Sequence, residues 1–327
     1  MRFFRRWNLA RGSSERLIKL EDFEMWVDPA GRGLHRGLLK RAEKLAKGDD
    51  PGPEREPEFH WIIRKELSEL CQIFADRDER LVIYNLGANI GLSTLKMNHI
   101  AKSLLSRNNY FIYAIEPDPV NIYFLKKNIT HNNARAQAFD CAISDFNGSS
   151  VFYRSSHSNL GALIKNELTD AGTYQVQVYS LPGFAKLFET GNPHFLKIDV
   201  EGGEVEVLRG AREFFAGCKA PCRMIMEVHP GSYSKERSLE TELRFLFENG
   251  WMCKYMVSAG VVQPDKFKQA GLQPFKEFHT KNHSRGIYRD FSKEHVLEFA
   301  CYEHIQEIPG KKPSRKIVRS IFLEKER

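Results

Sequence analysis

Short apolar runs alternate with longer helical patterns through the middle of the chain, from about residue 61 to about residue 230. Four of these runs are four to six residues long and end at a glycine or a polar residue; they cover 81–86, 110–115, 136–139 and 195–198. Such runs, separated by amphipathic segments, are typical of parallel strands joined by crossover helices. The pattern therefore predicts an α/β domain with a mostly parallel sheet.

The later part of the chain continues this alternation less regularly. Residues 239–249 have the apolar spacing of a helix that Gly250 would close, and 251–257 form a candidate returning strand. We divide the chain into an N-terminal extension with a linker, a central domain, and a C-terminal extension with a basic tail, at 1–60, 61–260 and 261–327. We expect the two extensions to wrap around the central domain.

The composition is that of a soluble globular protein. Of the 327 residues, 42% are hydrophobic and 28% are charged, and no apolar run approaches the roughly 20 residues that span a bilayer. The N-terminus lacks a secretory-signal pattern, and the six cysteines include no C-x-x-C pair. We therefore expect reduced thiols and a cytoplasmic location.

The net charge of +7 is concentrated at the two ends of the chain. Residues 1–16 hold five arginines, and residues 311–327 hold seven lysines and arginines against two glutamates. Basic ends of this kind can make weak contact with an anionic membrane surface, or they can simply be solvated. The sequence has no combination of basic and aromatic residues typical of sequence-specific nucleic-acid recognition.

The first two strand ends carry residues suited to a nucleoside. The segment Asn85–Gly91 contains Gly87 and Asn89, and its glycines let the backbone turn tightly and approach a ligand. Its G-x-x-x-G spacing differs from the G-x-G-x-x-G of dinucleotide enzymes, and a plain strand–turn–helix corner has the same pattern. Glu116, at the second strand end, is placed to accept hydrogen bonds from both ribose hydroxyls.

The third and fourth strand ends add further polar residues. Asp140 and Cys141 follow the third strand, where a carboxylate and a backbone N–H can hold an adenine edge, although Asp140 is equally compatible with a turn. Lys197, Asp199 and Glu201 lie at the end of the fourth strand. Burial would destabilise such charges unless they were paired or used, which favours a cleft role for the two acids.

A fifth strand-like segment, 224–228, is apolar except for Glu227 and is followed directly by His229. His229 is a candidate general base because the imidazole pKa is ~6.5, and Glu227 lies beside it in the sequence. Together with Asp199 and Glu201, this pair offers donor atoms that Mg²⁺ or Mn²⁺ accepts. We nevertheless predict a site without a metal ion.

Taken in order, these motifs resemble the FkbM-type methyltransferases. The resemblance extends over roughly residues 81–230 and is specific as a set, although each piece alone is weak. The matching segments are LGANIG at 86–91, EPDPVN at 116–121, Asn128 with Asn132, AISD at 142–145 with Gly148, KIDVEGGE at 197–204 with LRGA at 208–211, and MEVH at 226–229.

The resemblance implies a Rossmann-like class I methyltransferase fold, with helices on both faces of the sheet and the catalytic domain at 61–260. It implies S-adenosylmethionine as methyl donor and O-methylation of a sugar or another small-molecule or glycan acceptor. Donor binding is expected from Asn85, Gly87, Asn89, Gly91, Glu116, Asp140, Cys141 and Asp199. Catalysis is expected from Asp199, Glu201, His229 and Lys197, with Asp199 or His229 as the base.

Three alternatives to this interpretation stay open, and one of them is a membrane-surface or scaffold protein that acts through the basic ends of the chain. The family pattern has an aspartate where this chain has Asn85, which can hydrogen-bond the donor but cannot pair with its ammonium group. This departure favours a non-catalytic S-adenosylmethionine-binding protein; a nicotinamide-dependent oxidoreductase is disfavoured by the missing glycine motif. The polar segment 154–173 is a candidate lid over the acceptor or a plain surface loop.

Overall fold

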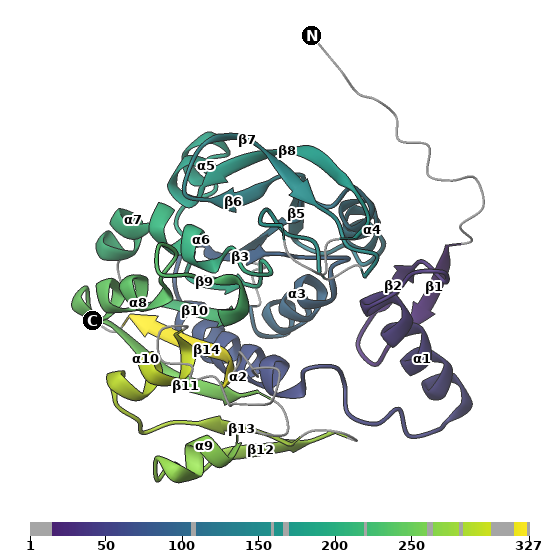
Figure 1. The fold of residues 1–327 in the computed structure, drawn as a ribbon. Coiled ribbons are helices and arrows are strands. Elements are labelled where there is room, and N and C mark those ends of the chain that lie inside the picture. Colours follow the sequence, from purple (N-terminus) through teal and green to yellow (C-terminus); the bar gives the residue numbers. More distant parts are fainter. Residues whose placement is uncertain are drawn as a thin grey trace.

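A nine-stranded sheet forms the centre of the computed structural model (Figure 1), in the order β12-β13-β11-β14-β10-β9-β3-β4-β5. The structure describes residues 15–105, 109–157, 160–165, 170–218, 221–259, 264–280, 284–301 and 317–325. The strands are β3 (Leu81–Leu86), β4 (Tyr110–Ile115), β5 (Ala136–Phe139), β9 (Phe195–Ile198), β10 (Cys222–Glu227), β11 (Trp251–Ser258), β12 (Lys276–His279), β13 (Ser284–Tyr288) and β14 (Val318–Lys325). The four predicted strands are confirmed with their predicted bounds.

The sheet is parallel from β5 to β10, because β4 pairs with β5 and β3, β3 pairs with β9, and β9 pairs with β10 in the same direction. Strand β14 lies between β10 and β11 and runs antiparallel to both. The carboxyl ends of β3, β4, β9 and β10 therefore lie along one edge, where ligands bind in open parallel sheets.

Side chains alternate between the two faces of the sheet, as β3 illustrates. Val82, Tyr84 and Leu86 join a core that includes residues of α5 (Leu181–Leu187), α6 (Glu204–Gly210), α7 (Arg212–Gly217), α8 (Leu239–Glu248) and α10 (Lys293–Ala300). Leu81 and Ile83 join a second core with α2 (Pro57–Phe74) and α3 (Leu92–Leu104), and α4 (Pro119–His131) packs against Ala114 of β4. Helices therefore cover both faces, and the predicted Rossmann-like fold class is confirmed.

An N-terminal unit docks beside α4 (Figure 1). It consists of the hairpin β1 (Arg16–Lys19) and β2 (Glu24–Val27) followed by α1 (Leu34–Lys47). Buried Asn128 of α4 accepts from the Trp26 N–H at 2.6 Å and donates to the carbonyls of Trp26 and Ile90, at 3.1 and 2.8 Å. One amide thus joins the hairpin to the turn after β3.

A small sheet lies over the same edge of the large one and is ordered β6-β8-β7. Its strands are β6 (Ala142–Ser144), β7 (Gly148–Tyr153) and β8 (Thr173–Ser180). The candidate lid segment connects β7 to β8, and of it residues 158–159 and 166–169 lie outside the described residues. The remaining elements are α9 (Pro264–Gln269) and the 3₁₀ turn η1 (Pro230–Ser232).

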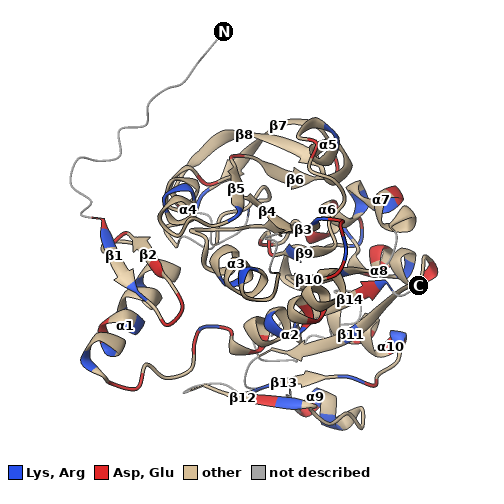
Figure 2. Ribbon diagram, turned by 180° about the vertical axis from the view of Figure 1, so that it is seen from behind, with Lys and Arg blue, Asp and Glu red and all other residues tan. Residues whose placement is uncertain are grey.

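Charged residues of both signs are interspersed over the described elements (Figure 2). Most of the basic ends, residues 1–14 and 302–316, lie outside the described part of the chain. Among the described residues, no helix is both long and apolar enough to span a membrane. All six cysteines are free thiols, and five of them are buried.

Candidate active site

The turn after β3 packs directly against the end of β9. Gly87 has a φ of +74°, and a Cβ at this position would lie 1.8 Å from the carbonyl oxygen of Asp199. The N–H groups of Gly87 and Ala88 both donate to the Ile115 carbonyl, at 3.0 and 2.9 Å. A glycine is therefore required here, because any side chain would push the ends of β3 and β9 apart.

Glu116 holds this turn in place from the end of β4. Its Oε2 accepts from the Asn89 N–H at 2.7 Å, and its Oε1 accepts from the Asp118 N–H at 3.0 Å. The side chain is buried, and burial together with the nearby Asp118 raises the pKa of Glu116 to about 7. Asn89 adopts a left-handed φ of 50°, a conformation that is often found at functional turns.

A cavity of about 780 Å³, including its open mouth, lies against this turn and is called the first cavity below. Its polar residues include Glu116, Asp118 and Asn89. Its apolar residues include Ile115, Ile143, Phe152 and Leu163. A cavity lined by apolar side chains and a buried carboxylate suits a nucleoside, which has an apolar base face and a ribose with two hydroxyls.

A second cavity adjoins the first and shares Gly87, Asn89, Asp199 and Glu201 with it. The second cavity has more charged residues in its lining than the first. Its further charged or titratable residues are Arg55, Glu56, His60, Lys197, Glu227, His229 and Arg319. A molecule in the second cavity would therefore meet one in the first cavity at the ends of β3 and β9.

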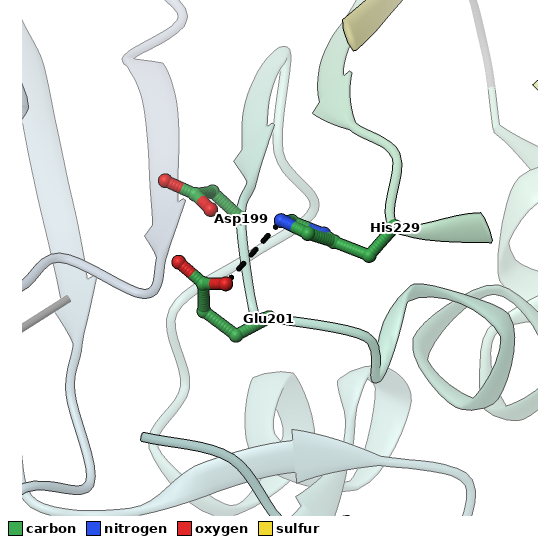
Figure 3. Close-up of side chains that lie close together, drawn as sticks. All are labelled: Asp199, Glu201 and His229. Atoms are coloured by element: carbon green, nitrogen blue, oxygen red, sulfur yellow. Dashed lines mark ion pairs between the residues drawn. The ribbon is translucent and has the colours of Figure 1, made fainter. Parts of the chain in front are cut away.

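Three side chains converge where the two cavities meet: Asp199 and Glu201 after β9 and His229 after β10 (Figure 3). We call them the Asp–Glu–His cluster. His229 Nε2 lies 3.4 Å from Glu201 Oε2 and 3.5 Å from Glu227 Oε1. Buried Lys197 approaches Asp199 Oδ2 at 3.1 Å and donates to the Gly87 carbonyl at 2.7 Å.

The electrostatics of the cluster are set by burial and by these ion pairs. Loss of water around the Asp199 carboxylate raises its pKa; the Lys197 ammonium opposes this shift, and the Glu227 carboxylate adds to it. Glu201 has a left-handed φ of 52°, and Asn89, which lines the same two cavities, has one of 50°. Such backbone conformations of residues other than glycine are often found at functional sites.

A buried network fixes the ring of His229. Glu204, which is fully buried, lies 2.9 Å from His229 Nδ1 through its Oε1 and accepts from the Tyr233 hydroxyl at 2.9 Å through its Oε2. Burial alone would raise the pKa of Glu204, but His229 and the N–H of Gly202 hold it below its ordinary value. Glu204 is therefore ionised, and Nδ1 of His229 carries a hydrogen toward it.

Arg319 reaches the site from the last strand, β14. Its guanidinium lies 2.6 Å from Glu56 Oε1 and 3.3 Å from Glu227 Oε1. It is largely buried, and the surrounding carboxylates raise its pKa further above the ordinary value. Residues from both extensions, Glu56 and Arg319, therefore form one wall of the second cavity.

Most of the predicted site residues meet at these two cavities, but four of them, Asn85, Gly91, Asp140 and Cys141, line neither one. Asn85 is buried inside β3, where its Nδ2 donates to Thr94 Oγ1 at 2.9 Å and its Oδ1 has no hydrogen-bond partner. Asp140 is exposed and Cys141 is buried. At that strand end, Ala142 and Ile143 line the first cavity instead.

Gly91 has a structural role beside the cavities. It caps the N-terminus of α3 with a φ of +101°, and a Cβ there would lie 2.9 Å from Leu125 Cδ1 of α4. The sequence predicted its position in the turn. The sequence did not reveal that Glu56, His60 and Arg319 line the second cavity or that Glu204 contacts His229. Of these four residues Glu204 alone carried a signal, as the last residue of the KIDVEGGE segment.

Comparisons with known proteins identify the family of the chain. The family model "Methyltransferase FkbM domain" matches residues 85–255, just over half of the chain. "Methyltransferase 1" of Beauveria bassiana (strain ARSEF 2860) is 27% identical over 194 residues, which are 51% of this chain and 75% of the relative.

Two solved structures are also similar. Methyltransferase FkbM from Methylobacillus flagellatus KT is 17% identical, with a TM-score of 0.35, and the match covers 64% of this chain and 44% of that one. This chain thus matches less than half of that protein's length. Aeropyrum pernix fibrillarin, solved in complex with S-adenosyl-L-methionine, is 13% identical with a TM-score of 0.30, over 70% of this chain and 76% of that one.

Proposed function

The chain belongs to the FkbM methyltransferase family, and from this premise we propose that it is an S-adenosylmethionine-dependent O-methyltransferase. Its fold is the Rossmann-like class I methyltransferase fold that the motifs predicted. The acceptor that we propose is a hydroxyl of a sugar or of another small molecule or glycan. A cytoplasmic location stays a prediction.

The observation that carries the proposal is the buried Glu116 carboxylate at the wall of the first cavity. Its two oxygens already accept from the Asn89 and Asp118 N–H groups, which hold it in one orientation. Because Oε1 also accepts from Asn121 Nδ2 at 3.3 Å, the free lone pair lies on Oε2, where it can accept from a ribose hydroxyl. Gly87, which cannot tolerate a Cβ, lets this turn pack against the end of β9 at the junction of the two cavities, where we place the methionine part of the donor.

The donor supplies an electrophilic methyl group on a sulfonium when it is bound. The residues of the chain have to align an acceptor oxygen with that group and to accept its proton. Asp199 and Glu201 line both cavities, so they lie where the two ligands would meet. Alignment of this kind contributes ~7–11 kcal/mol to lowering the barrier in favourable cases.

The proton of the acceptor goes to the Asp–Glu–His cluster, with Asp199 or His229 as the base. The raised pKa of Asp199 brings this carboxylate closer to the pH at which a base works well. His229 is held by Glu204 at Nδ1, which turns Nε2 toward the second cavity. Arg55, His60 and the Arg319–Glu56 pair give that cavity the polar walls that an acceptor with several hydroxyls needs.

Calorimetry with S-adenosylhomocysteine tests the donor half of the proposal. We expect binding by the wild-type protein and loss of binding in Glu116→Ala. Folded protein that binds neither S-adenosylmethionine nor S-adenosylhomocysteine would overturn the proposal. For the acceptor half, a screen of sugars and small hydroxyl compounds should show methyl transfer that drops in Asp199→Asn and in His229→Ala; undiminished turnover in both folded variants would contradict the catalytic assignment.

The second candidate, a non-catalytic S-adenosylmethionine-binding protein, rests on Asn85. Because Asn85 lies inside β3 and bonds to Thr94, it removes no side-chain contact from either cavity. Its effect on donor binding would be indirect, through the geometry of the turn after β3. Donor binding without transfer to any acceptor, with transfer restored in Asn85→Asp, would favour this candidate.

A further inference from the structure

The Asp–Glu–His cluster has the donor set and the spacing of a metal site. One ligand atom each of Asp199, Glu201 and His229 lies within 4.8 Å of the other two. The three residues come from two neighbouring strand ends, and Figure 3 shows their side chains turned toward a common point. All three also line the second cavity, where further coordination positions face open space.

The orientation of His229 gives a second observation, independent of the cluster. Its Nδ1 is 2.9 Å from Oε1 of Glu204, which is fully buried and stands outside the cluster. Metal-binding histidines characteristically donate their other ring N–H to a carboxylate in this way. With the hydrogen on Nδ1, Nε2 presents a lone pair toward the cluster.

The neighbours of this lone pair are carboxylates. Nε2 lies 3.4 Å from an oxygen of Glu201 and 3.5 Å from an oxygen of Glu227. The Nε2 atom and these carboxylate oxygens together form a negatively polarised group that would attract a divalent cation placed among them.

We propose that Asp199, Glu201 and His229 bind a divalent cation of the Mn²⁺ and Mg²⁺ class, which in turn binds the acceptor hydroxyl. Two carboxylates and one imidazole suit these ions, and the imidazole favours Mn²⁺ over Mg²⁺. The proposal rests on the proposed function, because it assigns the cation to the acceptor in the second cavity.

The cation changes the role of His229 in transfer. His229 becomes a ligand and no longer takes the proton. The acceptor O–H, polarised by the cation, breaks and releases its proton to water at the mouth of the second cavity. The O–CH₃ bond then forms as the S–CH₃ bond breaks, and the donor leaves as an uncharged thioether.

Binding of Mn²⁺ alone tests the site without any need for activity. The full chain, freed of metal by a chelator and dialysed, is titrated with Mn²⁺ and followed by electron paramagnetic resonance or calorimetry. We expect one Mn²⁺ per chain, with affinity at least tenfold weaker in His229→Ala and in Glu201→Gln. Glu204→Gln, which alters the residue behind the ligand, should lower the affinity about 10–100-fold.

His279→Ala is the matched control. His279 is an exposed histidine 3.6 Å from Glu277, so it reports adventitious binding to a surface His–Glu pair. We expect this variant to bind Mn²⁺ as the wild type does. Near-ultraviolet circular dichroism checks folding; if His229→Ala does not fold, Glu201→Gln decides the result.

The proposal is overturned if the wild type binds no Mn²⁺, or if the folded cluster variants bind it as tightly as the wild type. Calorimetry with S-adenosylhomocysteine in the presence of chelator separates this failure from that of the proposed function. Donor-product binding without Mn²⁺ binding refutes the metal site and leaves the methyltransferase assignment standing. Loss of donor-product binding in folded protein refutes the assignment itself.

Discussion

Protonation of Glu116 should control the affinity for the donor near neutral pH. The carboxylate has a pKa of about 7 in the folded protein, because it is buried and lies near Asp118. Only the ionised form can accept from a ribose hydroxyl while its two oxygens also hold the Asn89 N–H, the Asp118 N–H and the Asn121 amide. The ionised fraction rises from about one tenth at pH 6 to about nine tenths at pH 8. Affinity for S-adenosylhomocysteine should therefore increase roughly tenfold over this range.

Stability should change in the opposite direction. The folded-state pKa of Glu116 lies above the ordinary value of 4.5, so the folded protein binds this proton more tightly than the unfolded chain does. The stabilisation of the folded protein by this tighter proton binding is fully present below pH 4.5 and is lost as the pH rises through about 7. The two pKa values differ by about 2.5, and at 1.36 kcal/mol per pH unit the free energy of unfolding falls by about 3 kcal/mol.

Glu116→Gln removes the titration and keeps the shape of the side chain. The amide places an NH₂ group against one of the two backbone N–H donors, which costs about 1–3 kcal/mol. Calorimetry at pH 6 and 8 and urea unfolding at pH 5 and 8 compare this variant with the wild type. Both pH trends should be weaker in Glu116→Gln. Equal trends in the two proteins would show that another group titrates and that the reasoning is wrong.

Three further changes probe other parts of the molecule. Gly87→Ala should lose S-adenosylhomocysteine binding in calorimetry and unfold at lower urea, because its Cβ would meet the Asp199 carbonyl at 1.8 Å in a backbone with φ +74°; a wild-type midpoint would contradict this. Glu204→Gln should reduce turnover about 100-fold or more, because Glu204 orients His229, and should leave the donor affinity unchanged, because Glu204 lies outside the first cavity. A change in donor affinity without a change in turnover would argue against that role of Glu204. Phe322→Ala should lower the free energy of unfolding by about 3–5 kcal/mol in urea titrations, because this side chain is fully buried on β14, between β10 and β11. A loss of less than about 1 kcal/mol would mean that β14 contributes little to the core.

The parallel half of the sheet could be predicted because its signals are local. Each of β3, β4, β5 and β9 is a short run that ends at a glycine or a polar residue, and the buried strands are apolar on both faces. The positions of Glu116 and Asp199 followed from the same runs, since strand ends at one edge of a sheet lie together. In this half of the sheet, the local sequence pattern alone is enough to predict the strands and the residues at their ends.

Strand β14 was not predicted because its local pattern points elsewhere. Val318–Lys325 lies in a stretch whose charges suggested a solvated tail, and its apolar centre spans residues 321–323. The strand forms because β10 and β11 leave a space between them, and this space is created by segments about 70 to 100 residues earlier in the chain. Arg319 illustrates the consequence: no feature of its neighbours in sequence indicates a site residue, yet it lies 3.3 Å from Glu227.

Glu204 shows the same limit within the recognised motif. An acid at the first position of a helix is favoured by the helix dipole, and this explanation accounts for the sequence alone. In the structure the carboxylate is fully buried and lies 2.9 Å from both His229 Nδ1 and the Tyr233 hydroxyl. Only the approach of the loop after β10 to the start of α6 distinguishes a capping acid from one that orients a histidine.

The two cavities differ in where their residues come from, and this difference bears on specificity. Glu116 and Asn89, which we propose to bind the donor, lie inside the stretch 85–255 that matches the family. Part of the second cavity instead comes from Glu56, His60 and Arg319, which lie outside that stretch. If the first cavity binds the donor and the second the acceptor, as we propose, changes in the extensions can alter the choice of acceptor without disturbing donor binding. Acceptor specificity in this chain should therefore follow the extensions rather than the family domain.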